Sequence, residues 1–294
     1  MSAQLNMKGL VAALLFVFGG TVSAATILSN GTAPGDNFTN ASGSNTGQAV
    51  GASGWYYNNV RNNGAVGINT DYARSGNGSA NLTTTQGPAG ASSKADIEYL
   101  ANAVQVSGNW FANGSLGLFT SLTSMSYDWY RNSSSTNSAV QHPAMRVLLD
   151  LDGNLATTSD RGGLVYERAY NAVGNAATDT WVSESIGASS KLWNFGLGLG
   201  FEFDIDGDST PYDTLTEWQA SARMVNAVIL GFSVGVGSGW GPFDGATDNI
   251  AWSIGTQSMS SNFEVPASQV PEPGPLALFA LMALGVAATR RTRH

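Results

Sequence analysis

From residue 55 onward, short apolar segments alternate with clusters of turn residues along the chain. In segment 124–130, Tyr127 and Trp129 fall on one face of an extended strand, while Asp128 and Tyr130 fall on the other. Helical periodicity is hard to find in the interior, apart from short turns near residues 171–177 and 189–195. The pattern predicts strands at residues 95–100, 116–118, 124–130, 145–151, 164–169, 181–185, 200–205, 217–230, 231–236 and 250–254.

Short strands at this spacing predict a single all-β sandwich, jelly-roll or concanavalin-like, over residues 55–256. Residues 26–54 are rich in Gly, Ser, Asn and Thr, so we expect loops there with room for one edge strand. Residues 257–269 lack an apolar period and are predicted to be a linker to the C-terminal segment.

The first 25 residues have the pattern of a secretory signal peptide, with its apolar part forming a short helix. Lys8 supplies the positive charge, and residues 10–18 form an apolar run that is too short to span a bilayer. Small residues follow, which predicts cleavage by signal peptidase after Ala24 or Ala25. The sequence therefore predicts an exported protein.

The C-terminal segment, residues 270–294, is a second membrane-directed element. Its apolar run at residues 276–288 is shorter than the ~20 residues of a permanent span. Every face of this run is apolar, whereas a helix docked on a domain should show a polar stripe. The arginines that follow should stay cytoplasmic, which leaves the domain outside the inner membrane. The residues that carry this prediction are Pro271, Glu272, Pro273, Arg290, Arg291 and Arg293.

Composition narrows the classes of partner. The chain has 294 residues and a formal net charge of −8. Some of its basic residues lie in the two terminal segments: Lys8, Arg290, Arg291 and Arg293. The part of the chain between the two terminal segments is acidic, which argues against nucleic acid or an anionic membrane surface as partner. Cysteine is absent, so stability must come from the core or from bound ions.

Val270, Pro271, Glu272 and Pro273, followed by an apolar run and an arginine cluster, resemble the PEP-CTERM sorting signal. The resemblance implies recognition by an exosortase-like processing enzyme in a Gram-negative bacterium that makes exopolysaccharide. It also implies a transient stay in the inner membrane and a final place at the cell surface or outside the cell.

The part of the chain between the two terminal segments more weakly resembles the uncharacterised β-sandwich ectodomains found with such tails. The matching pieces are residues 126–130, 149–154, and 237–240 leading to 248–250. In jelly-roll, concanavalin-like and carbohydrate-binding sandwiches, a closing strand of this Asp-Asn-Ile type often holds a structural calcium. The resemblance implies Asp248 as a calcium ligand.

The best metal candidate in the sequence is Asp204, Asp206 and Asp208, with Asp213 nearby. Carboxylates two residues apart, with a turn glycine, supply the hard oxygen ligands that calcium prefers. The segment departs from an EF-hand loop, because glycine occupies the fourth position and Leu215 the twelfth. The alternative is an ordinary Asp-Gly turn with solvated acids. Asp150 and Asp152 offer a smaller set of the same kind.

No catalytic residue is assigned from the sequence. A Gly-x-Ser-x-Gly motif occurs at residues 231–235, but a nucleophile elbow needs a following helix and a later histidine. Glycine-rich sequence follows instead, and His142 precedes the serine, so the motif indicates a glycine-rich strand. A glycosidase needs only two carboxylates. The candidates for such a pair are Glu98, Glu167, Glu184, Glu202 and Glu217.

Aromatic residues offer a possible sugar-stacking surface, although most should fill the core. Alternation places Trp129 in the core, while residues 55–57 and Trp240 lie beside glycine-rich loops and are expected at the surface. Two classes of function follow. The first is a non-catalytic surface or matrix protein that binds polysaccharide or packs into a biofilm. The second is an extracellular carbohydrate-active enzyme that uses a carboxylate pair.

Overall fold

The computed structural model describes residues 24–85, 92–171, 174–239 and 241–267. Residues 1–23 of the predicted signal peptide lie outside this part of the chain, and so does the whole predicted tail. No helix among the described residues is long and apolar enough to cross a membrane. The sorting residues outside the described part are Pro271, Glu272, Pro273, Arg290, Arg291 and Arg293.

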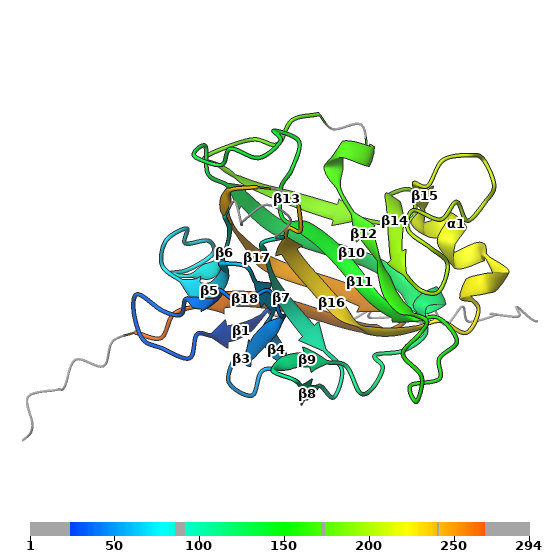
Figure 1. The fold of residues 1–294 in the computed structure, drawn as a ribbon, viewed down its shortest axis with the longest axis horizontal. Coiled ribbons are helices and arrows are strands. Elements are labelled where there is room, and N and C mark those ends of the chain that lie inside the picture. Colours follow the sequence, from blue (N-terminus) through cyan, green and yellow to red (C-terminus); the bar gives the residue numbers. More distant parts are fainter. Residues whose placement is uncertain (1–23, 86–91, 172–173, 240, 268–294) are drawn as a thin grey trace, which may run out of the picture.

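The described residues form two antiparallel sheets that pack face to face (Figure 1). Sheet A runs in the order β1 (Ala25–Leu28), β18 (Gln257–Glu264), β17 (Phe243–Ile254), β6 (Ser79–Thr84), β5 (Gly64–Asn69) and β2 (Phe38–Asn40). β10 (Leu122–Arg131) also pairs with β17, and β13 (Trp181–Ile186) pairs with β10. β1 departs from the antiparallel pattern by pairing parallel to β18.

Sheet B covers the other side of the core. Its order is β15 (Asp213–Thr214), β14 (Lys191–Gly196), β12 (Arg161–Tyr166), β11 (Ala144–Asp150), β16 (Val228–Val236), β7 (Lys94–Leu100), β4 (Trp55–Arg61) and β3 (Thr46–Ala49). A separate hairpin is formed by β8 (Val104–Val106) and β9 (Asn109–Phe111). The helical elements in the described part are α1 (Leu215–Ala220) and the 3-10 turns η1 (Phe119–Ser121), η2 (Arg168–Asn171) and η3 (Ala222–Met224).

Large aromatic side chains join the two sheets in the core. Trp252 of β17 stacks on Phe232 of β16, with ring centroids 4.4 Å apart, and lies 6.0 Å from Trp55 of β4. Trp55 also packs edge-on against Phe263 of β18 at 5.0 Å. These contacts link strands distant in sequence, and burial of aromatic rings contributes much of the hydrophobic stabilisation of such a core.

The structure confirms the prediction of an all-β sandwich. The predicted strands at 95–100, 124–130, 145–151 and 181–185 correspond to β7, β10, β11 and β13, while 231–236 and 250–254 lie within β16 and β17. The strand predicted at 164–169 is shifted to β12. The alternation in β10 is also confirmed, because Tyr127 and Trp129 are fully buried between the sheets.

Other predicted elements are wrong. Residues 200–205 form a loop, because Gly196, Gly198 and Gly200 take positive φ values and turn the chain. The first part of 217–230 is α1, where Thr214 and Glu217 form a capping box. Residues 189–195, predicted as a helical turn, mostly belong to β14. At 116–118, where a strand was predicted, the structure has only an isolated β-bridge from Leu118 to Val228.

The domain also extends beyond both predicted bounds. Residues 26–54 contain β2, β3 and most of β1, where room for one edge strand was predicted. Most of the predicted linker 257–269 is β18, which pairs with β17 on one side and β1 on the other. Strands with weak apolar patterns form here because neighbouring strands supply their hydrogen-bond partners.

Candidate functional site

A pocket of about 680 Å³ lies on the face of sheet B that points away from the core. β7 places side chains on both faces in alternation: Ala95 and Ile97 are buried in the core, while Asp96 and Glu98 line the pocket. Gly235 faces Asp96 in register on β16, and a Cβ there would lie 1.8 Å from Asp96 Oδ1. The glycine therefore leaves room for the carboxylate.

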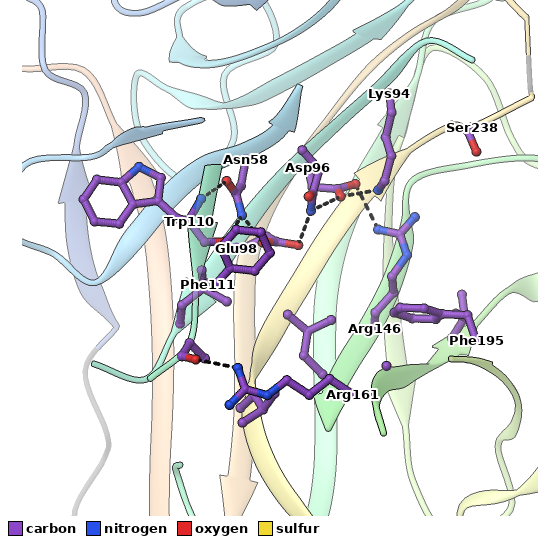
Figure 2. A pocket seen from close by; sticks show the side chains of 18 of the residues that line it. Asn58, Lys94, Asp96, Glu98, Trp110, Phe111, Arg146, Arg161, Phe195 and Ser238 are labelled. Atoms are coloured by element: carbon purple, nitrogen blue, oxygen red, sulfur yellow. Dashed lines mark hydrogen bonds and ion pairs between the residues drawn. The ribbon is translucent and has the colours of Figure 1, made fainter. Parts of the chain in front are cut away.

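Two basic side chains neutralise Asp96. Arg146 of β11 reaches across β16 and places its Nη1 3.1 Å from Asp96 Oδ1 (Figure 2). Lys94, two residues before Asp96, pairs with its other oxygen, Oδ2. Burial opposes ionisation of Asp96, but Lys94 and Arg146 outweigh it and hold the pKa of this carboxyl below its usual value. Asp96 is therefore an anion within an internal ion cluster.

Glu98 is held by two amides instead of cations. Asn58 Nδ2 donates to Glu98 Oε2 at 2.7 Å, and Asn59 Nδ2 donates to Glu98 Oε1 at 2.9 Å. Asn59 Nδ2 also lies 3.0 Å from Asp96 Oδ2, so one amide joins the two carboxylates. Burial, and secondarily the charge of Asp96, raise the pKa of Glu98 to about 7. Neighbouring acids on one strand thus have opposite pKa shifts.

The β8–β9 hairpin forms one wall of the pocket through Trp110 and Phe111. Asn58 fixes this wall, because its Oδ1 accepts from Trp110 N at 3.0 Å and its Nδ2 donates to Trp110 O at 2.9 Å. The Trp110 ring packs on Tyr56 with centroids 4.6 Å apart. Phe111 is 46% exposed, which leaves an apolar ring available at the pocket edge.

The opposite wall comes from β14 and the loop that follows it. Trp193 and Phe195 line this side together with Phe201, whose side chain is 68% exposed. Trp193 packs edge-on against Phe201 at 5.2 Å, and its Nε1 donates to Glu167 Oε2 at 3.3 Å. Burial raises the pKa of Glu167. The pocket therefore has a polar floor between two aromatic walls.

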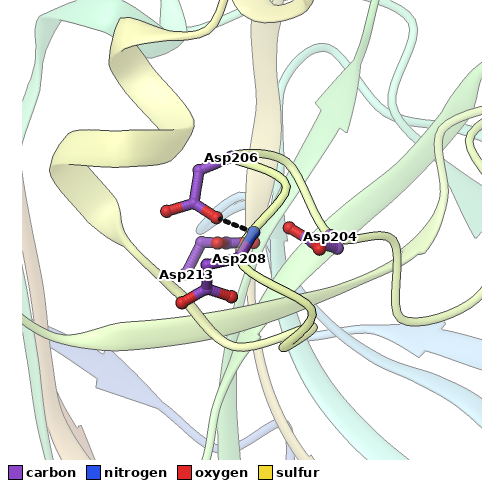
Figure 3. A group of neighbouring side chains, drawn as sticks. All are labelled: Asp204, Asp206, Asp208 and Asp213. Atoms are coloured by element: carbon purple, nitrogen blue, oxygen red, sulfur yellow. Dashed lines mark hydrogen bonds between the residues drawn. The ribbon is translucent and has the colours of Figure 1, made fainter.

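The predicted calcium ligands Asp204, Asp206 and Asp208 do lie together, in the loop between β14 and β15, and Asp213 of β15 joins them (Figure 3). One carboxylate oxygen of each lies within 4.8 Å of the others. Several oxygens accept backbone N–H groups of the same loop, such as Gly207 N on Asp204 Oδ1 at 2.6 Å. Burial, followed by the nearby acids, raises the pKa of Asp213 to about 6. Calcium binding here stays a prediction.

Asp248 lies elsewhere, on β17 of sheet A, directly opposite Asp128 of β10. Its side chain is fully buried, and Oδ1 accepts from Phe263 N at 2.8 Å. Burial raises its pKa to about 7, with Glu264 and Asp128 adding to the effect. Among the described residues it belongs neither to the group of Asp204, Asp206, Asp208 and Asp213 nor to a second group formed by Asp150, Asp152 and Asp160, so Asp248 remains a separate predicted ligand.

The aromatic predictions are partly wrong. Trp55 and Tyr57 are fully buried, where the sequence suggested a surface position, while Tyr56 is half-buried beside Trp110. Trp129 is buried, which confirms its predicted place in the core. Trp240 lies outside the described residues.

Four residues that line the pocket were not predicted from the sequence: Lys94, Asp96, Arg146 and Trp110. A signal for one pair was present, because alternation in 95–100 puts Asp96 and Glu98 on one face. The Gly-x-Ser-x-Gly motif lies inside β16, as expected for a glycine-rich strand. Its Ser233 is buried and accepts a hydrogen bond from Arg146 Nη1 at 3.3 Å, which is no arrangement for a nucleophile.

No protein-family model matches the sequence, and no curated protein matches it. Among solved structures, the chain is similar to one described by the words "Structural basis for the promiscuous specificity of the carbohydrate-binding modules from the beta-sandwich super family". The identity is 14% and the TM-score 0.31, over 71% of this chain and 56% of that chain. The chain thus spans little more than half the length of that structure, and the chemistry of the site rests on its own residues.

Proposed function

We propose that this is an exported polysaccharide-binding protein and that the pocket on sheet B holds a segment of an uncharged polysaccharide. The observation that carries this proposal is the two aromatic walls, Trp110 with Phe111 and Trp193 with Phe201, on either side of a polar floor. A sugar ring presents C–H groups on its faces and hydroxyl groups around its edge. Aromatic rings suit the former, and the part-exposed polar side chains of the lining, such as Asn59 and Glu167, suit the latter.

The charge of the pocket favours a neutral ligand. Its lining contains three acids and three bases: Asp96, Glu98, Glu167, Lys94, Arg146 and Arg161. Opposite charges are paired within this set, as between Arg146 and Asp96. A polyanion would meet buried carboxylates with no excess of cations to offset them, which disfavours charged polymers.

The extent of the pocket favours a chain over a single sugar. Its lining comes from six neighbouring strands, from β4 through β7, β16, β11 and β12 to β14. Five inter-strand spacings correspond to about 24 Å across the sheet. A ligand that contacts both aromatic walls must therefore be longer than one sugar ring.

A second candidate function, glycoside hydrolysis, is favoured by the opposite pKa shifts of Asp96 and Glu98. One acid kept ionised beside one with a pKa of about 7 is the pairing that acid and nucleophile roles require. Binding without turnover is better supported, because Asp96 and Glu98 are only 1% and 4% exposed. Their oxygens are also engaged by Lys94, Arg146 and the two amides.

Affinity electrophoresis in gels containing xylan, starch or hydroxyethyl cellulose tests binding, with alginate as the charged comparison. We expect retardation by at least one neutral polymer and a loss of affinity of about tenfold or more in Trp193→Ala. Trp181→Ala is the matched control, because Trp181 lies on β13 of sheet A. Release of reducing ends from the bound polymer would favour the enzyme. Unretarded protein in every neutral gel, or unchanged affinity in Trp193→Ala, would contradict the proposal.

The jelly-roll or concanavalin-like character of the sandwich and the cellular route also belong to this proposal. We infer that signal peptidase cleaves after Ala24 or Ala25 and that an exosortase-like enzyme acts near Pro271–Pro273. The domain would then reach the cell surface or the extracellular matrix, where a polysaccharide ligand is found. The two membrane-directed sequence patterns support this route.

A further inference from the structure

A second acidic cluster lies where β11 gives way to the loop leading into β12. Asp150 ends β11, Asp152 follows two residues later, and Asp160 directly precedes β12. One carboxylate oxygen from each lies within 4.8 Å of those of the other two. The antiparallel pairing of β11 with β12 thus brings together acids from both ends of the loop.

Two oxygens of this cluster are buried without a partner. Asp150 is fully buried, and its Oδ1 has no hydrogen-bond partner among the described atoms. Asp160 Oδ1 is also buried and unpartnered within the described part of the molecule. A buried carboxylate oxygen with no hydrogen-bond donor carries a large desolvation penalty. An unpaired oxygen at this position therefore indicates that it binds a donor or a cation.

The charges around the cluster do not balance. Arg161 faces Asp150 in register and places Nε 3.1 Å from Asp150 Oδ2. Its other nitrogens are occupied, because Nη1 donates to Ala112 O and Nη2 to Leu155 O, each at 3.0 Å. Three carboxylates therefore share one guanidinium, and ionised acids leave an excess of two negative charges. One divalent cation would cancel this excess.

We propose that Asp150, Asp152 and Asp160 bind a divalent cation, with calcium as the best match. Asp152 Oδ1 accepts from Asn154 N at 2.7 Å, and Asp160 Oδ2 accepts from Asp152 N at 3.0 Å. These bonds leave one oxygen on each acid to join Asp150 Oδ1 around the ion. The ligands are hard carboxylate oxygens, and exposure of Asp152 allows water to complete the coordination shell.

The site has a structural connection to the pocket. Arg161 lines the pocket and shares Asp150 with the proposed cation. The cation would tie the loop 151–160 to the end of β11, which also carries the pocket residue Arg146. It would therefore hold the Arg161 side of the pocket in place, whatever ligand the pocket takes.

The test is calorimetric titration of the chelator-stripped full-length chain with calcium chloride. Asp206→Asn combined with Asp208→Asn serves as the background, since it removes two acids of the other cluster. We expect that this background still binds calcium and that adding Asp160→Asn lowers the affinity at least tenfold. Absence of calcium binding by the background at millimolar concentration, or unchanged affinity after Asp160→Asn, would overturn the site.

A thermal measurement separates lost binding from damage to the fold. In chelator, Asp160→Asn should melt at or above the temperature of the wild type, because it relieves repulsion among the three acids. In millimolar calcium the order should reverse, since only the wild type gains stability from binding at Asp150, Asp152 and Asp160, while any gain at the other cluster is common to both proteins. A variant that melts lower than wild type by the same amount in both conditions would indicate a purely structural aspartate and contradict the proposal.

Discussion

Asn58 Nδ2 donates to Glu98 Oε2 at 2.7 Å, although the register partner of Asn58 on β7 is Asp96. Asp96 is held instead by Lys94, Arg146 and the neighbouring amide of Asn59. The same Asn58 amide holds the backbone of Trp110, so it couples the aromatic wall to the acid with the pKa of about 7. The protonation state of Glu98 should therefore influence both stability and ligand binding.

We predict that Glu98→Gln makes stability less dependent on pH. The folded-state pKa of about 7 exceeds the usual 4.5, so the folded protein binds more protons between these values. Stability from this group is full below about pH 4.5 and is lost as the pH rises through 7, by on the order of 3 kcal/mol. Urea unfolding at pH 5 and pH 8 should show a smaller loss in the variant. An equal loss in both proteins would exclude this role.

His142 should act in the opposite direction. Burial lowers its pKa to about 3, and its ring stacks on Trp129 at 4.8 Å. In the unfolded chain His142 binds a proton near pH 6.5, whereas in the folded protein it stays neutral down to about pH 3. Stability should therefore fall as the pH drops from about 6.5 toward 3.

The matched variant is His142→Gln, which can keep an acceptor for Arg168 N and a donor for Pro143 O. We expect a lower free energy of unfolding at pH 7 but a flatter decline between pH 7 and pH 4. A decline as steep as that of the wild type would assign acid sensitivity to other groups.

Calcium should raise the melting temperature through Asp204, Asp206 and Asp208. Binding only to the folded state adds about 2.7 kcal/mol at a hundredfold excess over Kd. Asp206→Ala should reduce the calcium-dependent increase measured by differential scanning fluorimetry, while the exposed Asp71→Ala should not. If chelator leaves the wild-type melting curve unchanged, the acids at 204–208 are simple turn residues.

The C-terminal segment should control retention in the membrane. Deleting residues from Val270 onward should release the domain to the periplasm or medium, as followed by cell fractionation. Replacing Arg290, Arg291 and Arg293 by alanine should weaken retention, because each arginine costs about 2.5–3.5 kcal/mol to move to the bilayer centre.

Mass spectrometry of the mature protein provides the second measurement for this segment. Processing near Pro271–Pro273 predicts that mature protein lacks residues 276–288. Mature protein that retains them would show that the tail is not a processed signal. A deletion variant that fractionates like the full chain would show that the tail is not the anchor.

The capping box of α1 shows how a local signal can be present and still be outweighed. Thr214 and Glu217 have the spacing that begins a helix, yet the apolar residues around them also suit a strand. The helix forms because Trp218 packs into the core and donates from Nε1 to Leu192 O at 3.1 Å. Likewise, β18 has little apolar periodicity and depends on hydrogen bonds from β17 and β1.

The class of fold and the buried faces of the clearest strands could be predicted from the amino-acid pattern alone. Alternation such as that of Tyr127 and Trp129 is a local property, because side chains on a strand point to opposite faces in turn. The sequence also placed Asp204, Asp206 and Asp208 in one loop, since their proximity follows from their spacing.

The pocket, in contrast, depends on contacts between residues that are far apart in the sequence. Asp96 and Arg146 are separated by 50 residues and meet because β16 lies between β7 and β11. Trp110 reaches the same site on a separate hairpin, and the cluster of Asp150 with Asp160 depends on the pairing of β11 with β12. Periodicity fixes the direction of each side chain, but strand pairing fixes its neighbours, and that pairing is set by packing of the whole sandwich.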